Sequence, residues 1–149
     1  MKIVSLKKNT VMTASFLIAL GHAGIAAAHS QSGSLGSAAG ATDVYRVTCS
    51  NDGSGAPHHL VTQVRDNSPV KPPLVSVVTT KGGSSTTSTD PVDGNSAYSP
   101  EKELNKSSGV YIMDIKKSAT GAENYTAQFH CETASDAHTG TSWSQTQNQ

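Results

Sequence analysis

The segment that most constrains the fold is residues 109–131, GVYIMDIKKSATGAENYTAQFHC. Branched and aromatic side chains dominate residues 110–115, as in a half-buried strand. In the second part, Tyr125, Phe129 and Cys131 share one face and polar residues take the other. The intervening SATGAEN is rich in turn-forming residues. Alternation with one polar face is typical of antiparallel sheets, so the segment predicts two strands that form a hairpin.

Further strands are predicted upstream of this segment, and no helical periodicity is present. Residues 43–49, 60–65 and 74–80 carry strand patterns, and residues 98–104 suggest a short additional strand. Prolines separate the second and third of these strands, while residues 81–97 are Gly, Ser, Thr and Asp-rich and are expected to form a loop. The chain is therefore predicted to be all-β, as a small antiparallel sandwich or jelly roll.

The chain has two cysteines, Cys49 and Cys131. Each lies on the same strand face as an aromatic residue, Tyr45 in the first case and Phe129 in the second. In an exported chain, two cysteines are read as one disulfide. A bridge requires the strands that carry them to be neighbours or to face each other across the core.

The N-terminal residues 1–28 have the pattern of a secretory signal peptide. Three lysines precede a mostly apolar run at residues 11–20, which is followed by Ala26-Ala27-Ala28. The apolar run is too short to cross a bilayer, so no stable membrane span is expected after cleavage. The sequence thus predicts a periplasmic or secreted protein with His29 as its new N-terminus.

The mature chain of about 120 residues is the size of one small domain. Residues 29–42 are glycine- and serine-rich and are expected to form a flexible arm or a loosely laid strand. Residues 43–132 form the predicted sandwich, and residues 133–149 read as a polar tail. Basic and acidic residues are equal in number in the full chain, so losing the lysines of residues 1–28 leaves the mature chain acidic. This balance argues against nucleic acid as a partner.

Three short motifs suggest a family resemblance. They are DVY at residues 43–45, GVY at 109–111 and NYT at 124–126. In this order, they resemble the opening and closing strands of bacterial pre-peptidase C-terminal (PPC) domains. The resemblance implies a small jelly roll that acts as a non-catalytic secreted module, sometimes calcium-binding or carbohydrate-associated. The expected disulfide is unusual for that family, and no peptidase precedes the domain.

Histidine is the most distinctive candidate ligand, and the chain outside residues 1–28 carries five: His29, His58, His59, His130 and His138. Imidazole binds copper and zinc well. If His29 is the mature N-terminus, its amine and ring could chelate one metal, as in copper proteins and lytic polysaccharide monooxygenases. His130 or His138 could complete such a brace if the arm lies along their strand. The alternative is that these are surface histidines without a partner.

Other chemistry has weaker support. Asp90, Asp93 and Asn95 offer oxygen ligands for calcium, but their spacing differs from that of an EF-hand, and a solvated loop is the simpler interpretation. Calcium is therefore expected less than copper or zinc. Motifs of serine hydrolases, zinc peptidases and phosphate-binding loops are absent from the sequence.

The leading hypothesis is an exported, non-catalytic binding module that holds copper or zinc through its histidines. One alternative is a copper-dependent redox enzyme with His29 in a brace. Another is a structural or envelope-associated subunit that uses exposed edge strands. The expected partner is a metal ion, an extracellular or periplasmic protein, or a glycan.

Overall fold

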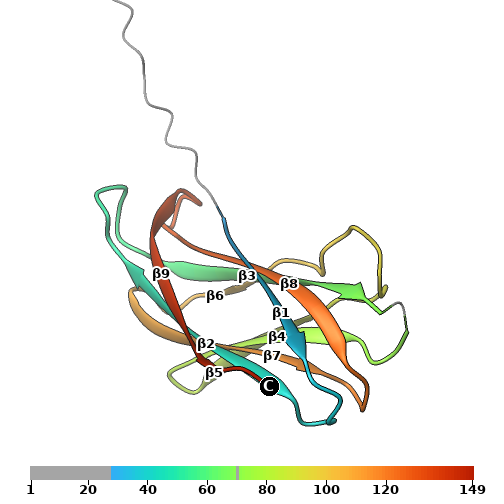
Figure 1. Ribbon diagram of the computed structural model, residues 1–149. Coiled ribbons are helices and arrows are strands. Elements are labelled where there is room, and N and C mark those ends of the chain that lie inside the picture. Colours follow the sequence, from blue (N-terminus) through green and yellow to red (C-terminus); the bar gives the residue numbers. More distant parts are fainter. Residues whose placement is uncertain (1–27, 70) are drawn as a thin grey trace, which may run out of the picture.

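The computed structural model describes residues 28–69 and 71–149, and these form an all-β, antiparallel structure (Figure 1). Apart from Ala28, the expected signal peptide lies outside the described residues. No helix of the described part has the length and apolar character needed to cross a membrane. The strands are β1 (His29–Leu35), β2 (Thr42–Ser50), β3 (His59–Ser68), β4 (Val75–Lys81), β5 (Ser84–Thr89), β6 (Lys102–Leu104), β7 (Gly109–Lys117), β8 (Glu123–Glu132) and β9 (His138–Gln147).

The strands form two layers that share β9. Hydrogen bonding follows the order β5-β4-β7-β2-β9-β8-β3-β6, and β1 pairs with β8 beside this path. One layer contains β5, β4, β7 and β2, and the other contains β6, β3, β8 and β1. Strand β9 pairs with β2 along most of its length and with β8 only at its first two residues. The predicted antiparallel sandwich is therefore confirmed.

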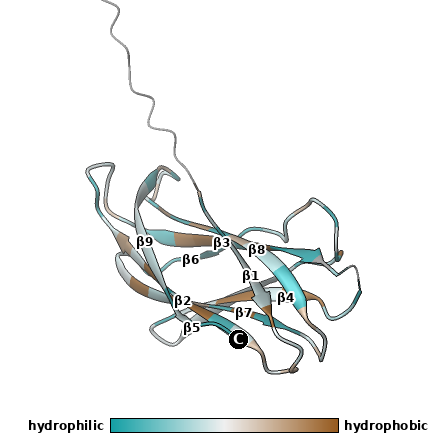
Figure 2. Cartoon of the chain, viewed as in Figure 1, coloured by the Kyte–Doolittle hydropathy of each residue, from teal (hydrophilic) through white to brown (hydrophobic). Residues whose placement is uncertain are grey.

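The core lies between the two layers. Alternate residues of β2, β4, β7 and β8 are buried, so each strand turns an apolar face inward. Figure 2 shows the resulting hydrophobic patches on the strands. The disulfide between Cys49 of β2 and Cys131 of β8 links the layers, as predicted. The largest buried side chains of the core include Tyr45, Tyr111, Tyr125, Phe129, Leu35, Leu60, Met113 and Ile115.

The two strands predicted from residues 109–131 are present as β7 and β8, but the predicted hairpin is wrong. Strand β7 pairs with β2 and β4, whereas β8 pairs with β1 and β3. The connecting residues 118–122 carry the chain from one layer to the other. Alternation specifies which face of a strand is buried but not which strand lies beside it, so it cannot separate a hairpin from this arrangement.

Strand β1 replaces the arm expected at residues 29–42. All seven of its residues pair with β8, so the strand interpretation is confirmed and the flexible arm is not. Its serines face outward, where the Ser32 hydroxyl lies 3.1 Å from the Thr126 hydroxyl and Ser34 donates to Asn124. These side-chain contacts and the backbone pairing hold a strand that has little apolar surface.

The polar tail predicted over residues 133–149 is wrong, because it contains β9, and the sandwich extends accordingly from residue 29 to 147. Backbone pairing with β2 needs no apolar side chains, and most of β9 is exposed and is white to teal rather than brown in Figure 2. Trp143 also packs edge-on against the rings of Tyr45 and Phe129. The loop expected at residues 81–97 likewise contains β5, which pairs with β4 after a turn in which Gly82 and Gly83 have φ of 56° and 76°.

Candidate metal centre

The strand register collects histidines around one glutamate. His59 at the start of β3 and His138 at the start of β9 are both register partners of Glu132 at the end of β8. Directly opposed residues of an antiparallel pair lie on the same face. His130 precedes Glu132 by two residues and therefore shares that face, the one directed away from the core. The four side chains thus meet at one end of β8.

The carboxylate of Glu132 lies at the centre of this group. Its Oε1 lies 2.8 Å from Nε2 of His130 and 3.6 Å from Nε2 of His138, and its Oε2 lies 2.8 Å from Nε2 of His59. The rings of His130 and His138 stack with centroids 4.2 Å apart and an interplanar angle of 13°. The side chains of Glu132 and His130 are 13% and 12% exposed, so the carboxylate and this imidazole are largely shielded from water.

A short turn holds His138 in place relative to Glu132. The Thr133 amide donates to the Ala137 carbonyl at 2.8 Å, and the Thr133 hydroxyl accepts hydrogen bonds from the amides of Ser135 and Ala137. Asp136 takes φ of 59°, which lets the chain reverse within five residues. Its carboxylate lies 3.9 Å from His59 Nε2, so it adds a second, exposed acidic group at the edge of the site.

His130 is electrostatically suited to bind a cation. Burial, with a further contribution from the neighbouring His138, lowers the pKa of His130. A lowered pKa favours the neutral imidazole, which is the form that binds metals. Its Nδ1 is buried and has no hydrogen-bond partner among the described residues, so protein contacts do not saturate this ring.

His58 and His59 extend the group behind Glu132. Nδ1 of the exposed His58 lies 3.1 Å from Nδ1 of the buried His59, whose Nε2 faces Glu132. Both hydrogen bonds can form at the same time when His58 donates to His59 and His59 donates to Glu132. Such a chain fixes the orientation of the Glu132 carboxylate.

His29 does not join this group. The expectation that its segment lies along the strand of His130 is confirmed, but the register pairs His29 with Phe129, and their rings stack with centroids 5.9 Å apart. Neighbouring residues of a strand point to opposite faces, so His29 lies on the face opposite to His130. The predicted brace of His29 with His130 or His138 is therefore not formed.

The calcium ligands proposed from the sequence are separated by their hydrogen bonds. Asp90 accepts from the amides of Asp66 and Val92, and Asn95 accepts from the amide of Ala97. Asp93 instead lies with Asp66 and Glu123, and one carboxylate oxygen from each of these three residues lies within 4.8 Å of the other two. Asp66 directly follows the strand predicted at residues 60–65, and Glu123 lies just before the second strand predicted within residues 109–131. Only the strand pairing brings them together.

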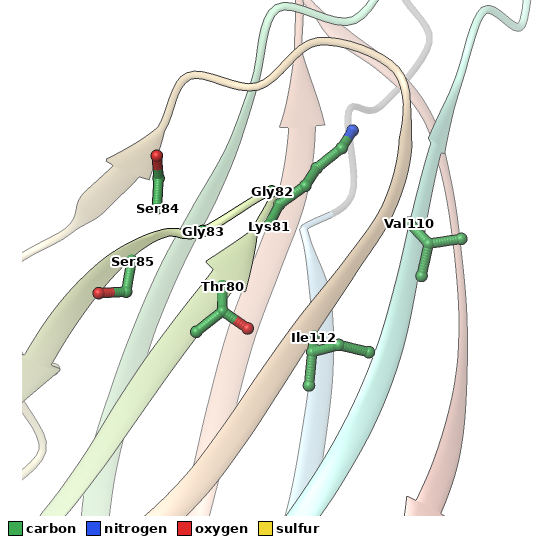
Figure 3. Close-up of a pocket in the computed structure, with 8 residues that line it drawn as sticks. All are labelled: Thr80, Lys81, Gly82, Gly83, Ser84, Ser85, Val110 and Ile112. Atoms are coloured by element: carbon green, nitrogen blue, oxygen red, sulfur yellow. The ribbon is translucent and has the colours of Figure 1, made fainter.

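A shallow hollow lies between the β4–β5 turn and the outer face of β7 (Figure 3). Lys81 is its one charged lining residue, and its amine donates to the carbonyls of Ser107 and Ser108 and lies 4.2 Å from the centroid of the Tyr111 ring. The remaining lining residues are glycine, hydroxyl and aliphatic side chains. No carboxylate or imidazole lines the hollow, so the group around Glu132 is the stronger candidate site.

The resemblance to PPC domains stays a prediction. No family model, curated protein or solved structure gives a significant match to this chain.

Proposed function

We propose that the protein is an exported, non-catalytic domain that binds one Zn²⁺ or Cu²⁺ ion through His130, His138 and Glu132. The observation that carries this proposal is the convergence of two Nε2 atoms on one carboxylate oxygen. Two imidazoles and one carboxylate are a ligand set found in zinc sites with an open fourth position. Copper is also well served by imidazole.

The distances between the donor atoms support a shared ion. Two ligands on a tetrahedral zinc ion with bonds of about 2.0–2.1 Å lie roughly 3.3 Å apart. The separations of 2.8 Å and 3.6 Å from Glu132 Oε1 to the two imidazoles bracket this value. One ligand atom from each of His130, Glu132 and His138 also lies within 4.8 Å of the other two.

His59 has a different role in this proposal. Its contact is with the other carboxylate oxygen, so it would hold Glu132 in the orientation that directs Oε1 toward His130 and His138. Groups that orient a metal ligand typically affect metal affinity by about 10–100-fold. His58 would act on His59 in the same way.

Export is part of the proposal and is supported by two observations. The first residues of the chain have the signal-peptide pattern, and the Cys49–Cys131 disulfide suits an oxidising compartment. The described residues give no specific support to a redox enzyme based on His29, because its imidazole lies on the other face of β8 from His130.

The proposal can be tested by calorimetric titration of metal-free protein with Zn²⁺ and Cu²⁺. We expect one ion per chain, with affinity reduced by more than about 100-fold in Glu132→Gln and in His130→Ala, since each removes one of three ligands. His59→Ala should weaken binding by about 10–100-fold. His29→Ala is the matched control and should bind like the wild type.

Two outcomes would overturn the proposal. The first is an absence of stoichiometric binding of either metal by the folded wild type. The second is binding that disappears in His29→Ala but persists in His130→Ala, which would move the metal to the N-terminus. Circular dichroism of each variant distinguishes loss of a ligand from loss of the fold.

A further inference from the structure

The opposite end of β8 carries a second group of potential ligands with different chemistry. Asp66 comes from the end of β3, Glu123 from the start of β8, and Asp93 from the connection between β5 and β6. Asp66 and Glu123 are 0% and 1% exposed, and Asp93 is half-buried. One carboxylate oxygen from each of the three residues lies within 4.8 Å of those of the other two. Three acidic groups are thus packed together under the surface.

Hydrogen bonds to the backbone bring Asp93 over Asp66. The Asp66 amide donates to Asp90 Oδ2 at 2.8 Å, and the Asp66 carbonyl accepts from the Gly94 amide at 3.1 Å. These two bonds fix the chain on both sides of Asp93. The Asp66 Oδ2 atom in turn accepts from the Val75 amide at 2.9 Å, which fixes the orientation of its carboxylate.

Most of the acceptor capacity of this group is unused. Among the described residues, Oδ1 of Asp66 and both carboxylate oxygens of Asp93 and of Glu123 are buried without a hydrogen-bond partner. Every ion pair in the described part of the chain involves a histidine, so no lysine or arginine there neutralises these acids at close range. An unpaired buried carboxylate is strongly unfavourable, so a cation coordinated by these oxygens would stabilise the group.

Burial and mutual repulsion govern the protonation of the group. Burial, together with the neighbouring Asp93, raises the pKa of Asp66 to about 7. Burial and Asp93 also raise the pKa of Glu123, while Lys117 and Lys71 act from further away to lower it. Lys117 uses its amine to donate to the carbonyls of Gly36 and Gly121 instead.

We propose that Asp66, Asp93 and Glu123 bind a Ca²⁺ ion that links β3, β8 and the β5–β6 connection. Calcium takes six to eight oxygen ligands in flexible geometry, and these three carboxylates have five oxygens without a hydrogen-bond partner to offer as ligands. Magnesium prefers to keep several of its waters, which suits a buried group poorly. Zinc and copper favour nitrogen and sulfur, so the two ends of β8 would select different cations.

The experiment is a calcium titration of chelator-treated protein, followed both by calorimetry and by thermal unfolding. We expect one Ca²⁺ per chain and a rise in melting temperature on its addition, because a ligand that binds only the folded state stabilises it. Magnesium at the same concentration should give a smaller rise.

The variants separate this site from the histidine group. Asp93→Asn and Glu123→Gln should each weaken Ca²⁺ binding by more than about tenfold, because each removes a charged ligand. Without calcium, Glu123→Gln should melt above the wild type, since it removes repulsion among buried carboxylates. Glu132→Gln, at the other end of the same strand, should bind calcium like the wild type.

The inference would be overturned if the folded wild type neither bound Ca²⁺ nor changed its melting temperature at millimolar calcium. Asp93 is half-buried in a loop, so Asp93→Asn leaves the core intact. The inference would also fail if this variant bound calcium as tightly as the wild type. Both results are independent of zinc or copper binding at His130 and His138.

Discussion

The hydroxyl of Tyr125 donates a 2.6 Å hydrogen bond to Oδ2 of Asp43 and so connects the two layers through the core. Tyr45 completes the group, because its hydroxyl lies 2.6 Å from that of Tyr125. The Gln149 amide donates to the other carboxylate oxygen of Asp43 at 2.8 Å. Asp43 and Tyr125 are fully buried, and burial raises the pKa of Tyr125, so its hydroxyl remains a donor.

Removing this hydroxyl should destabilise the fold. Tyr125→Phe would leave Asp43 Oδ2 without its donor and the Tyr45 hydroxyl without its acceptor. Unsatisfied buried polar groups cost about 1–3 kcal/mol, so we expect a loss of that size in the free energy of unfolding, measured with urea. Tyr98→Phe, at a half-exposed ring near Arg65, is the control and should change stability by less than about 0.5 kcal/mol. Equal unfolding midpoints for Tyr125→Phe and wild type would contradict the expected role.

Gly33 of β1 is constrained by the same tyrosine. A Cβ added at Gly33 would lie far inside van der Waals contact with the Tyr125 hydroxyl oxygen. Because Asp43 holds that hydroxyl, Gly33→Ala should displace either the ring or β1 and destabilise the fold by about 1–3 kcal/mol.

Hydrogen exchange can locate the effect of Gly33→Ala. Amides of residues 29–35 should exchange faster than in the wild type if β1 loses its pairing with β8. Ser30→Ala, on the outward face of the same strand, is the matched control and should leave their protection almost unchanged. Unchanged exchange and stability in Gly33→Ala would show that β1 can shift to admit the methyl group.

Sequence patterns could predict only part of this fold. Alternation identified the inward faces of the strands now labelled β2, β7 and β8, while the two cysteines of an exported chain predicted the disulfide that links the layers. It missed β5 and β9, whose residues are mostly polar. These strands are held by backbone pairing to β4 and β2, which leaves no periodic hydrophobic signal.

The residues of the candidate metal site were likewise predicted only in part from the sequence. Four of the five predicted histidines gather at one place, but Glu132, which organises them, was missed. The spacing of His130, Glu132 and His138 was a usable signal, since two of these residues share a strand face and the third follows a short turn. The sequence could not place His29 relative to His130, because only the β1–β8 register decides on which face His29 lies, and a shift of one residue reverses it.

Asp114 provides a test of pH dependence away from both candidate metal sites. It lies on the outer face of β7, in register with Val44 of β2 and Val78 of β4. Burial among these neighbours raises its pKa, and Lys116 opposes the shift. Because the folded state holds the Asp114 proton more tightly than the unfolded state, this group stabilises the fold below its unfolded pKa. That contribution is lost as the pH rises through the folded pKa.

Asp114→Asn removes this titration and should therefore stabilise the protein only where Asp114 is ionised. Near pH 7.5 we expect a gain of up to about 0.5 kcal/mol in the free energy of unfolding, limited by solvent screening of a half-exposed group. Near pH 3, where Asp114 is protonated in both states, the gain should vanish. Asp52→Asn is a control of opposite sign, because the Ser54 amide lowers the pKa of Asp52, so this variant should lose stability near pH 7.5. A difference between Asp114→Asn and wild type that stayed constant from pH 3 to pH 7.5 would assign the effect to packing rather than to charge.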